Sequence, residues 1–523
     1  MSNEFAYVDV KLFTLRLPLT TLLSAVQWSV VRGLVVSLRS MLAILTTHPI
    51  QYQVPLWQAL AKDGRVPFEV WYLTSHAIKP TRDREFGKEF AWDLDMLAGY
   101  PHRFLDVAPG ASPGSFWKCR LKEKLRDRLR ESKVTALWIQ GWQVAAYWQA
   151  VREAKAAGVE VWLRGESNDL RETTRRQDNA TTRPRSVVSG PWSGGPKSWA
   201  KRVLLGQLFN RVDRFLYIGS ANKRLYQKFG VPDDKLCPAP YAVDNARFRQ
   251  QAAELRGKRK EVREAWSIPE NAFVILFCGK FIPKKRPMDL VAAAKRLLSR
   301  EQGAGSRAPA TQRGAGSAVQ GENASDSSPS SVLHAPSSSP DSQLQAPSSQ
   351  LHLLFVGSGE LGADLRSNCE VAFDGEQSAK RKAQSDALNH STLNSQPSTK
   401  PRVSFAGFLN QTEISRAYVA ADVLVLPSDY HETWGLVVNE AMASGLPSII
   451  SDQCGCAEDL GLPPNDTFEC GNIPRLRESI VARMPHSLNP REFSSALSPP
   501  SFSATINSVV DAFAGVNRQP GKG

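Results

Sequence analysis

The hydrophobic residues of the chain gather in short runs that alternate with stretches of helical spacing. Phe273 to Cys278 is wholly apolar, Val423 to Leu426 is a second such run ended by Pro427, and Leu42 to Thr46 has the same character in the first half. Short apolar runs, each followed by a polar turn and a helical stretch, are typical of buried parallel strands. The pattern predicts an α/β fold in which helices cover both faces of parallel sheets.

The chain is long enough for two such units. Its 523 residues exceed one ordinary domain and allow two cores of about 180 residues each. We place the first domain at residues 41–235 and the second at residues 236–490. For residues 491–523 we expect a C-terminal tail, with a helix returning to the first domain as one possibility.

Two segments of the second domain have the composition of non-globular chain. Residues 301–350 contain thirteen serines, and residues 374–400 are polar and almost without aromatic side chains. Such segments bury too little apolar surface to fold. We interpret both as disordered insertions; a linker between domains is the alternative, but the strand and helix pattern continues on either side.

Residues 1–40 do not fit the α/β pattern. Their longest uncharged run, Leu17 to Val31, has fifteen residues and lies between Arg16 and Arg32, whereas a membrane span needs about twenty. We therefore expect no transmembrane helix there. A basic interfacial anchor and a misassigned start codon remain as alternatives.

Two carboxylates flank the turn that follows Val423 to Leu426. Glu432 lies in the loop, and Glu440 lies inside a helix expected from about Gly435 to Ser444. Free amides at a helix start attract phosphate, and carboxylates accept hydrogen bonds from hydroxyls. A sugar joined to a diphosphate uses both. The alternative is that Glu432 is a solvated loop acid and Glu440 an exposed helix residue.

The sequence PSDYHETWGLVVNEAMASGLP resembles the donor-site motif of retaining glycosyltransferases of family 4. In that motif two glutamates separated by seven residues precede Ala-Met-Ala and Gly-x-Pro. The resemblance covers most of residues 41–472 and implies the GT-B architecture, in which two Rossmann-like domains face a cleft. It also implies that Glu432 faces the donor sugar, that Glu440 binds the ribose, and that the backbone of Gly435, Leu436 and Val437 holds sugar and phosphate.

Cations follow the apolar run Phe273 to Cys278. Lys280 and Lys285 lie beyond its end, where they suit a departing diphosphate. The family has basic residues at both positions, although Lys284 and Arg286 compete for the second role and a solvated cluster is the alternative.

The resemblance also suggests where the nucleotide base is held. In relatives it lies against the turn that corresponds here to Gly407, Phe408 and Leu409.

On the acceptor side this chain departs from the family's pattern. Many relatives have a histidine at the end of a first-domain strand, but the corresponding stretch, VEVWLRGESNDL, has Arg164 and Glu166 instead. We take both, with His48 after the first strand, as candidate acceptor-side residues. Arg164 and Glu166 could equally form an ion pair, and His48 could be a capping or packing residue.

The net charge of +14 suits acidic partners. The basic run Lys118 to Lys133 is expected to be a helix, either with a solvated face or in contact with anionic lipid. No recognition motif for nucleic acid accompanies the charge. The seven scattered cysteines suggest a reducing cytoplasm, with peripheral contact at the inner membrane face as a further possibility. No metal motif stands out, and we interpret Asp93 and Asp95 as local structure.

The resemblance therefore implies a metal-independent retaining transferase without a cofactor, which moves a sugar from a nucleoside diphosphate to a hydroxyl of a glycan or lipid-linked acceptor. Cell-envelope or exopolysaccharide synthesis is the expected setting. A GT-B-fold sugar-nucleotide epimerase and a non-catalytic nucleotide-sugar-binding protein are the alternatives.

Overall fold

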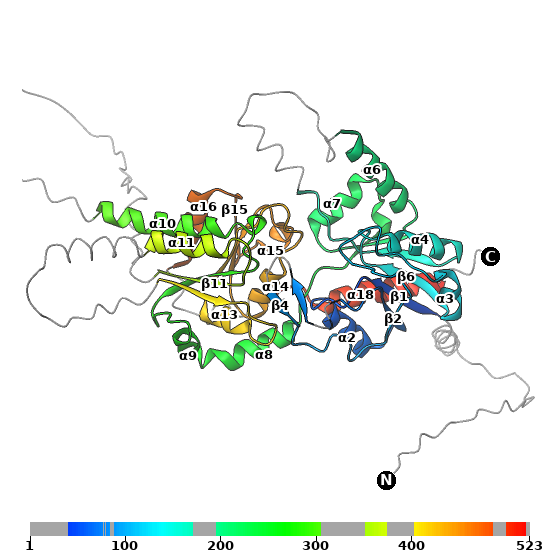
Figure 1. Cartoon of the computed structure of the whole chain (residues 1–523), viewed down its shortest axis with the longest axis horizontal. Coiled ribbons are helices and arrows are strands. Elements are labelled where there is room, and N and C mark those ends of the chain that lie inside the picture. The colour runs from blue at the N-terminus through cyan, green and yellow to red at the C-terminus, as the bar shows by residue number, and fades with distance from the viewer. Residues whose placement is uncertain are drawn as a thin grey trace, which may run out of the picture. The chain divides into compact units, whose positions relative to one another are not determined.

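Figure 1 shows the computed structural model of the chain, which describes residues 40–76, 78, 80–83, 88–170, 195–304, 351–373, 402–484 and 498–518. The expected leader, apart from its last residue, lies outside the described residues. So do residues 305–350 and 374–400, on which the predicted insertions fall.

The first sheet has seven parallel strands in the order β5-β2-β1-β6-β7-β8-β9. The order reverses between β1 and β6, because the chain adds strands on one side of β1 and then returns to the other. The first domain was expected to end at residue 235, and the last strand of this sheet, β9, lies just beyond that position. The strands are β1 (Met41–Thr46), β2 (Phe68–Tyr72), β5 (His102–Phe104), β6 (Val134–Ile139), β7 (Glu160–Leu163), β8 (Arg214–Tyr217) and β9 (Leu236–Pro238).

The second sheet has six parallel strands in the order β12-β11-β10-β13-β14-β15, which reverses between β10 and β13. The prediction of an α/β fold with parallel sheets is confirmed. These strands are β10 (Phe273–Cys278), β11 (Leu351–Val356), β12 (Val403–Gly407), β13 (Val423–Leu426), β14 (Ser448–Ser451) and β15 (Asp466–Phe468); β3 (Thr81–Asp83) and β4 (Lys88–Phe90) form a separate antiparallel pair.

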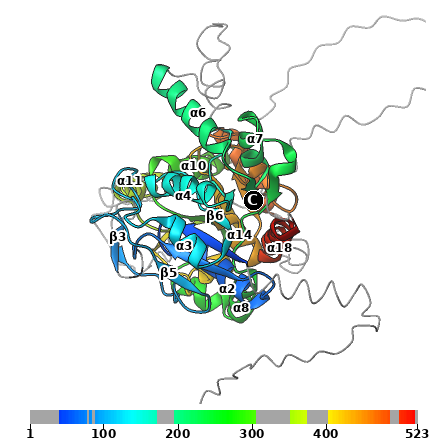
Figure 2. The same ribbon diagram turned by 90° about the vertical axis from the view of Figure 1, so that its right-hand side faces the viewer.

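Helices connect the strands. They are α2 (Val54–Asp63), α3 (Leu125–Glu131), α4 (Ala145–Ala156), α6 (Gly195–Phe209), α7 (Ser220–Lys228), α8 (Asn245–Arg256), α9 (Arg259–Glu264), α10 (Pro287–Ala304), α11 (Gly362–Phe373), α13 (Ser415–Ala420), α14 (Leu436–Ala443), α15 (Ala457–Leu460), α16 (Ile473–Arg483) and α18 (Phe502–Arg518), with 3₁₀ turns η1 (Asp233–Lys235) and η2 (Pro283–Lys285). In Figure 2, α6 extends away from the neighbouring elements.

Alternate residues of each strand serve opposite faces of the sheet. In β1, Leu42 and Ile44 pack with α2 and α18, whereas Ala43 and Leu45 pack with α3 and α4. This is the period of two that strand geometry requires. Both faces are covered, so the strand is apolar throughout.

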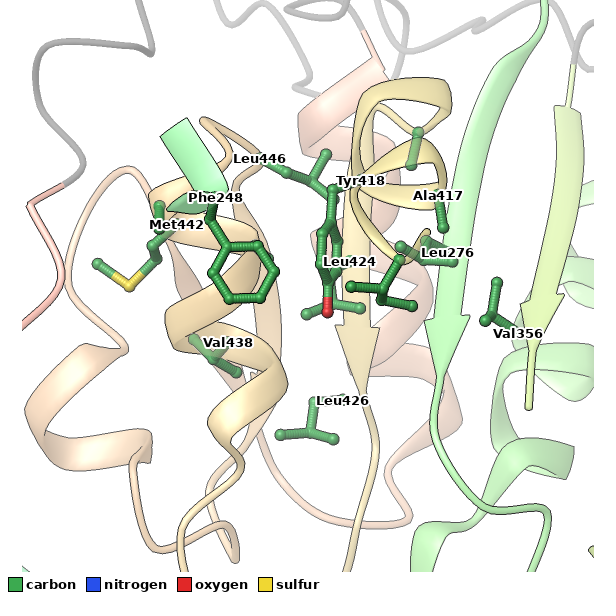
Figure 3. Packing of buried hydrophobic residues seen from close by; sticks show 14 of the residues in the cluster. Phe248, Leu276, Val356, Ala417, Tyr418, Leu424, Leu426, Val438, Met442 and Leu446 are labelled. Atoms are coloured by element: carbon green, nitrogen blue, oxygen red, sulfur yellow. The ribbon is translucent and has the colours of Figure 1, made fainter. Parts of the chain in front are cut away.

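The second sheet is covered in the same way. Helices α8, α9, α13 and α14 lie on one face, and α10, α11 and α16 on the other. Figure 3 shows the first of these cores, where the ring of Tyr418 of α13 lies beside that of Phe248 of α8, in the same cluster as Leu424 of β13.

Two predicted helices are shorter than expected. The helix expected over Lys118 to Lys133 is limited to α3, and the helix expected at about Gly435 to Ser444 is α14, one residue shorter at each end. Helix α10 continues through residues 301–304, which were expected to belong to an insertion. In the described part of the chain, no helix combines the length and apolar character that crossing a membrane requires.

Candidate functional site

A cavity of about 670 Å³ lies at the carboxyl ends of β10 and β13, the point where the order of the second sheet reverses. Open α/β sheets bind ligands at this position. Both halves of the chain contribute to the wall. The predicted site residues that line it are His48, Glu166, Lys280, Lys285, Glu432, Gly435, Leu436, Val437 and Glu440.

The start of α14 forms one wall. Gly435 is its N-cap, with φ 105°, and a Cβ atom added there would lie 2.7 Å from Leu426 Cδ2. Only glycine fits this backbone and this space. Leu436 and Val437 follow at the first helical turn, whose amides have no partner inside the helix. The wall therefore has the character of an anion site.

Lys285 and Glu432 meet on the next wall, where Lys285 Nζ donates to Glu432 Oε2. Their side chains are only 16% and 14% exposed. Burial by itself lowers the pKa of Lys285, but the adjacent Glu432 carboxylate outweighs burial and the net change is upward. Lys285 thus stays positively charged inside the cavity. Glu432 is not the solvated loop acid of the alternative interpretation.

Glu440 lies deeper along α14. Its Oε2 accepts a hydrogen bond from the Tyr418 hydroxyl, and burial raises the pKa of its carboxyl above the ordinary value. The neighbouring thiol of Cys278 is also buried, which raises its pKa to about 12 and keeps it protonated. The interpretation of Glu440 as an exposed helix residue is therefore wrong.

Two tyrosines hold Glu166 on the side of the first sheet. The hydroxyl of Tyr52 donates to its Oε1 at 3.0 Å, and the hydroxyl of Tyr241 donates to the same oxygen. His48 lies nearby, with Nδ1 2.9 Å from the Thr47 hydroxyl. Burial, helped by the neighbouring His76, lowers the pKa of His48 to about 4, so its ring is neutral at physiological pH.

Arg164 does not line the cavity. Its side chain is buried behind Tyr241, with the guanidinium 4.5 Å from the ring centroid, and it donates to the backbone oxygen of Ala239 at 3.2 Å. Arg164 and Glu166 therefore have different roles. Arg164 supports Tyr241, and Tyr241 in turn holds Glu166.

The segment Gly407, Phe408 and Leu409 also lies outside the lining. Phe408 packs against Phe90 and Trp92, with ring centroids 4.5 and 6.2 Å apart, and these two residues do line the cavity. This aromatic wall could not be predicted from local sequence, because Phe90 and Trp92 are more than 300 positions from Phe408.

Asp93 makes long-range contacts, so its interpretation as local structure is wrong. It accepts hydrogen bonds from the backbone amides of Gln411 and Thr412 at 3.1 and 2.9 Å. Asp95 does make the local contacts expected, accepting from Leu97 and Ala98. Asp93 instead joins a loop of the first half to the loop after β12.

Further contacts hold α14 against the chain that enters the second half. The indole Nε1 of Trp434 donates to Asn439 Oδ1 at 2.9 Å, and Asn439 Nδ2 donates to the backbone oxygen of Tyr241 at 3.1 Å. All three side chains are buried. Asn439, which directly precedes Glu440, is the residue in the sequence that could have indicated this contact.

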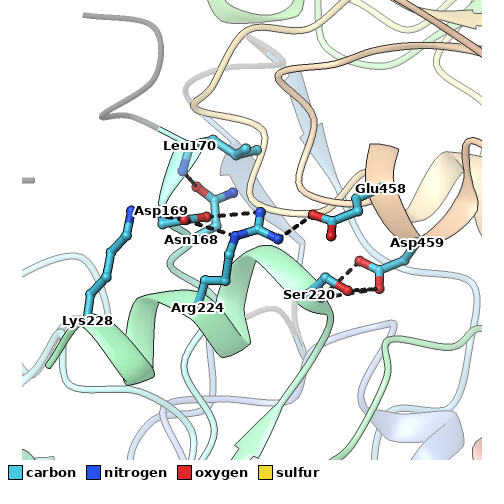
Figure 4. A network of polar contacts seen from close by, with 8 residues as sticks. All are labelled: Asn168, Asp169, Leu170, Ser220, Arg224, Lys228, Glu458 and Asp459. Carbon is cyan, nitrogen blue, oxygen red and sulfur yellow. Dashed lines mark hydrogen bonds and ion pairs between the residues drawn. The ribbon is translucent and has the colours of Figure 1, made fainter. Parts of the chain in front are cut away.

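A polar network joins α7 to α15 (Figure 4). Asp459 accepts from the amide and the hydroxyl of Ser220, and Arg224 contacts both Asp169 and Glu458. Because these residues come from the first and second halves, the network fixes how α7 meets α15. Among the described residues, no group of three or more His, Cys, Asp or Glu side chains is suited to a metal ion.

Residues 343–461 match the family model described as glycosyl transferases group 1. The D-inositol 3-phosphate glycosyltransferase 2 of Catenulispora acidiphila is 25% identical over 297 residues, which cover 56% of this chain and 53% of that protein. The sulfoquinovosyl transferase of Arabidopsis thaliana is 39% identical over 90 residues, 17% of either chain. The chain thus matches about half of the length of these relatives at most.

Solved structures confirm the GT-B fold. A glycosyltransferase from Rickettsia africae superposes with a TM-score of 0.52 at 10% identity, covering 92% of this chain and 99% of that one. The Anabaena protein HepE in complex with UDP gives 0.51 at 13% identity, with 91% and 100% covered. At these identities the likeness shows the fold alone.

Proposed function

We propose that the chain is a retaining glycosyltransferase that moves a sugar from a nucleoside diphosphate sugar to a hydroxyl acceptor without a metal ion. The observation that carries the proposal is the single cavity in which a helix start, a lysine–glutamate pair and a second glutamate converge. The match of residues 343–461 to group 1 glycosyl transferases supports it.

The phosphate-binding roles follow from charge. The diphosphate gains negative charge as it departs, and groups that are preorganised where charge develops stabilise the transition state. The amides at the start of α14 and the cation of Lys285 supply such groups, with Lys280 beside them in the lining. We assign Lys280 and Lys285 to the leaving diphosphate.

The two glutamates are assigned to the remaining parts of the donor, which are the ribose and the sugar. Glu440 lies beyond the start of α14, where its carboxylate accepts from the ribose hydroxyls. Glu432, held by Lys285, faces the donor sugar. Gly407, Phe408 and Leu409 are proposed to bound the base side, since Phe408 supports the aromatic wall of Phe90 and Trp92.

On the acceptor side we propose His48 and Glu166, both in the lining. The neutral imidazole of His48 is able to accept a hydrogen bond. Arg164 contributes by positioning Tyr241. Cell-envelope or exopolysaccharide synthesis at the inner face of the membrane is the setting we propose.

Release of free nucleoside diphosphate tests the function. The purified chain is incubated with a panel of UDP-, GDP- and ADP-sugars, with UDP-sugars included because HepE binds UDP. Thermal shift first identifies donors, since a ligand at 100 times its Kd stabilises by about 2.7 kcal/mol. A stabilising donor whose diphosphate is released only with a hydroxyl acceptor supports a transferase. Binding without release supports a non-catalytic binding protein, and conversion of the sugar without an acceptor supports an epimerase.

A further inference from the structure

A second cavity, of about 370 Å³, adjoins the first at the carboxyl ends of β1, β6 and β7. The two cavities share His48, Tyr52, Glu166 and Thr433 as lining residues. The strand order of the first sheet reverses between β1 and β6, so this cavity lies at a ligand-binding position of its own sheet. If the first cavity holds the donor, as proposed above, the second lies where the acceptor must enter.

The lining of the second cavity is polar but almost uncharged. Of the described residues that form it, Glu166 is the sole carboxylate and none is lysine or arginine; His48 is neutral at physiological pH because burial lowers its pKa to about 4. Amide and hydroxyl side chains predominate: Thr46, Thr47, Gln53, Gln140, Gln143, Tyr147 and Ser167.

This lining disfavours an anionic ligand. A phosphate there would approach Glu166 with no cation in the wall to neutralise it, and taking an uncompensated charge out of water is strongly unfavourable. Arg164 does not line this cavity, because its guanidinium lies against the Tyr241 ring and donates to the backbone oxygen of Ala239. The donor cavity differs in this respect, because its lining does contain cations, namely Lys280, Lys284 and Lys285.

Gln140 supplies a specific indication of a ligand. Its side chain is 8% exposed, yet the amide nitrogen Nε2 has no hydrogen-bond partner in the structure. A buried donor without a partner is unfavourable. A ligand hydroxyl that displaces the atoms now covering Nε2 would supply the missing partner.

Two glycines shape the adjoining wall. A Cβ atom on Gly165 would lie 2.1 Å from the Trp142 ring, and one on Gly141, with φ 107°, would lie 2.2 Å from Gln143 Oε1. The absence of side chains lets Trp142 and Gln143 lie directly against the backbone. A flat apolar ring beside amides complements a molecule that has both C–H faces and hydroxyl groups.

We propose that the second cavity binds an uncharged polyhydroxyl acceptor, such as a neutral sugar, and that Gln140, Gln143 and Trp142 select it. The inference rests on the proposed transferase function and adds the chemical class of the acceptor. Glu166, shared by both cavities, is then in reach of the hydroxyl that receives the donor sugar.

The test compares neutral sugars and polyols with phosphorylated counterparts. Glucose, maltose and myo-inositol are assayed against glucose 6-phosphate and inositol 1-phosphate, with the donor found by thermal shift. Binding of each is also followed by saturation-transfer NMR in the presence of the nucleoside diphosphate. We expect the uncharged sugars to bind and react better than the phosphates.

Variants then assign the selectivity. Gln140→Leu keeps the volume but removes the amide, and should raise the acceptor KM by about fivefold or more without changing the donor Kd. Gln143→Ala should act in the same direction and, because Gln143 is exposed, does not endanger folding. Gln207→Leu, at an exposed glutamine of α6, is the matched control and should change neither value.

The outcomes separate the two proposals. Stronger binding of the phosphates, or acceptor KM values within twofold of wild type in both cavity variants, overturns the neutral-acceptor inference while donor binding and turnover leave the transferase intact. If no nucleotide sugar binds and no diphosphate is released, the transferase proposal itself falls, and the inference falls with it.

Discussion

Lys285 and Glu432 lie 147 positions apart in sequence, yet the ammonium group of one donates to the carboxylate of the other inside the donor cavity. The pair joins the turn after β10 to the loop after β13. Each side chain therefore has two roles to test. One is its contribution to the stability of the fold, and the other is its contact with the donor.

Replacing Lys285 or Lys280 by alanine should lower kcat, because each change removes a cation from the leaving diphosphate. By analogy with lost oxyanion donors the loss is on the order of a hundredfold. Lys285→Ala should also lower the free energy of unfolding by roughly 3 kcal/mol, since it leaves Glu432 partly buried without its partner.

Steady-state kinetics and denaturant unfolding measure the two effects. Lys260→Ala, at a surface lysine whose side chain is 63% exposed, is the control and should alter neither. Activity within twofold of wild type in both cavity variants would rule out the diphosphate assignment.

Glu440→Ala should raise the donor KM and leave kcat nearly unchanged, because a ribose contact is similar in the ground and transition states. Tyr418→Phe is the companion variant: it removes the hydroxyl that donates to Glu440 and should produce a smaller shift in the same direction. A tenfold fall in kcat at constant KM would contradict the ribose role.

The same residue predicts a pH dependence. Burial raises the pKa of Glu440 above 4.5, so the carboxylate begins to take up a proton at a higher pH than an exposed glutamate. Donor affinity should therefore weaken as the pH falls toward this raised pKa. Calorimetric titration between neutral and acidic pH should show the weakening in wild type and not in Glu440→Gln. The effect on folding has the opposite sign: the contribution of Glu440 to stability is full below 4.5 and is lost as the pH rises through its raised pKa.

His48 should remain neutral through the physiological range. Its pKa is lowered to about 4, so its imidazole NMR signals should not titrate between pH 8 and 6. The signals are assigned from the His48→Gln spectrum. Since the folded-state pKa is depressed, its contribution to stability is present above 6.5 and is lost as the pH falls through about 4. A midpoint near 6.5 would contradict the burial of the ring.

Two neighbouring acids of α15 should differ in importance. Asp459→Ala removes the acceptor of the Ser220 amide and hydroxyl, and should lower the free energy of unfolding by about 1–2 kcal/mol. Glu458→Ala breaks only an ion pair with Arg224 whose side chains are 54% and 39% exposed, so we expect at most about 0.5 kcal/mol. Urea unfolding of both variants checks the order, and an equal or reversed effect would refute it.

A short Gly/Ser connector should replace the low-complexity insertion without loss of fold or donor binding, because its composition is unable to form a core. Since α10 continues to Ala304, the replacement begins at residue 305 and ends before Leu351. Limited proteolysis and donor titration of both forms measure the outcome. An insoluble variant, or one that does not bind donor, would show that the segment belongs to the domain.

Sequence alone was sufficient where the determining pattern is local. The apolar runs at Phe273 to Cys278 and Val423 to Leu426 became β10 and β13 with the predicted bounds. The start of α14 was also predictable from a local feature, Gly435. This residue is the N-cap of the helix, and its backbone conformation excludes other residues there.

Contacts between distant segments could not be predicted in this way. Nothing near Glu440 in sequence identifies Tyr418 as its partner, and nothing near Asp93 indicates that its carboxylate binds the amides of Gln411 and Thr412. Such contacts depend on how the sheets and loops come together, which local propensity does not encode. Arg164 shows the converse, because its position after a strand suggested a site residue although its side chain turns inward.

Helix α18 completes the core of the first sheet. Ile506, Val509 and Phe513 are buried in the core cluster that also contains Trp57 of α2 and Trp138 of β6. All strands of this sheet precede the second half of the chain, whereas α18 follows it. On a ribosome that adds about 5–20 residues per second, the apolar face of the first sheet thus waits roughly tens of seconds for its cover. The first sheet is thus among the last parts of the described chain to be completed, although its strands are made early, and its need for chaperones should be greatest during that interval.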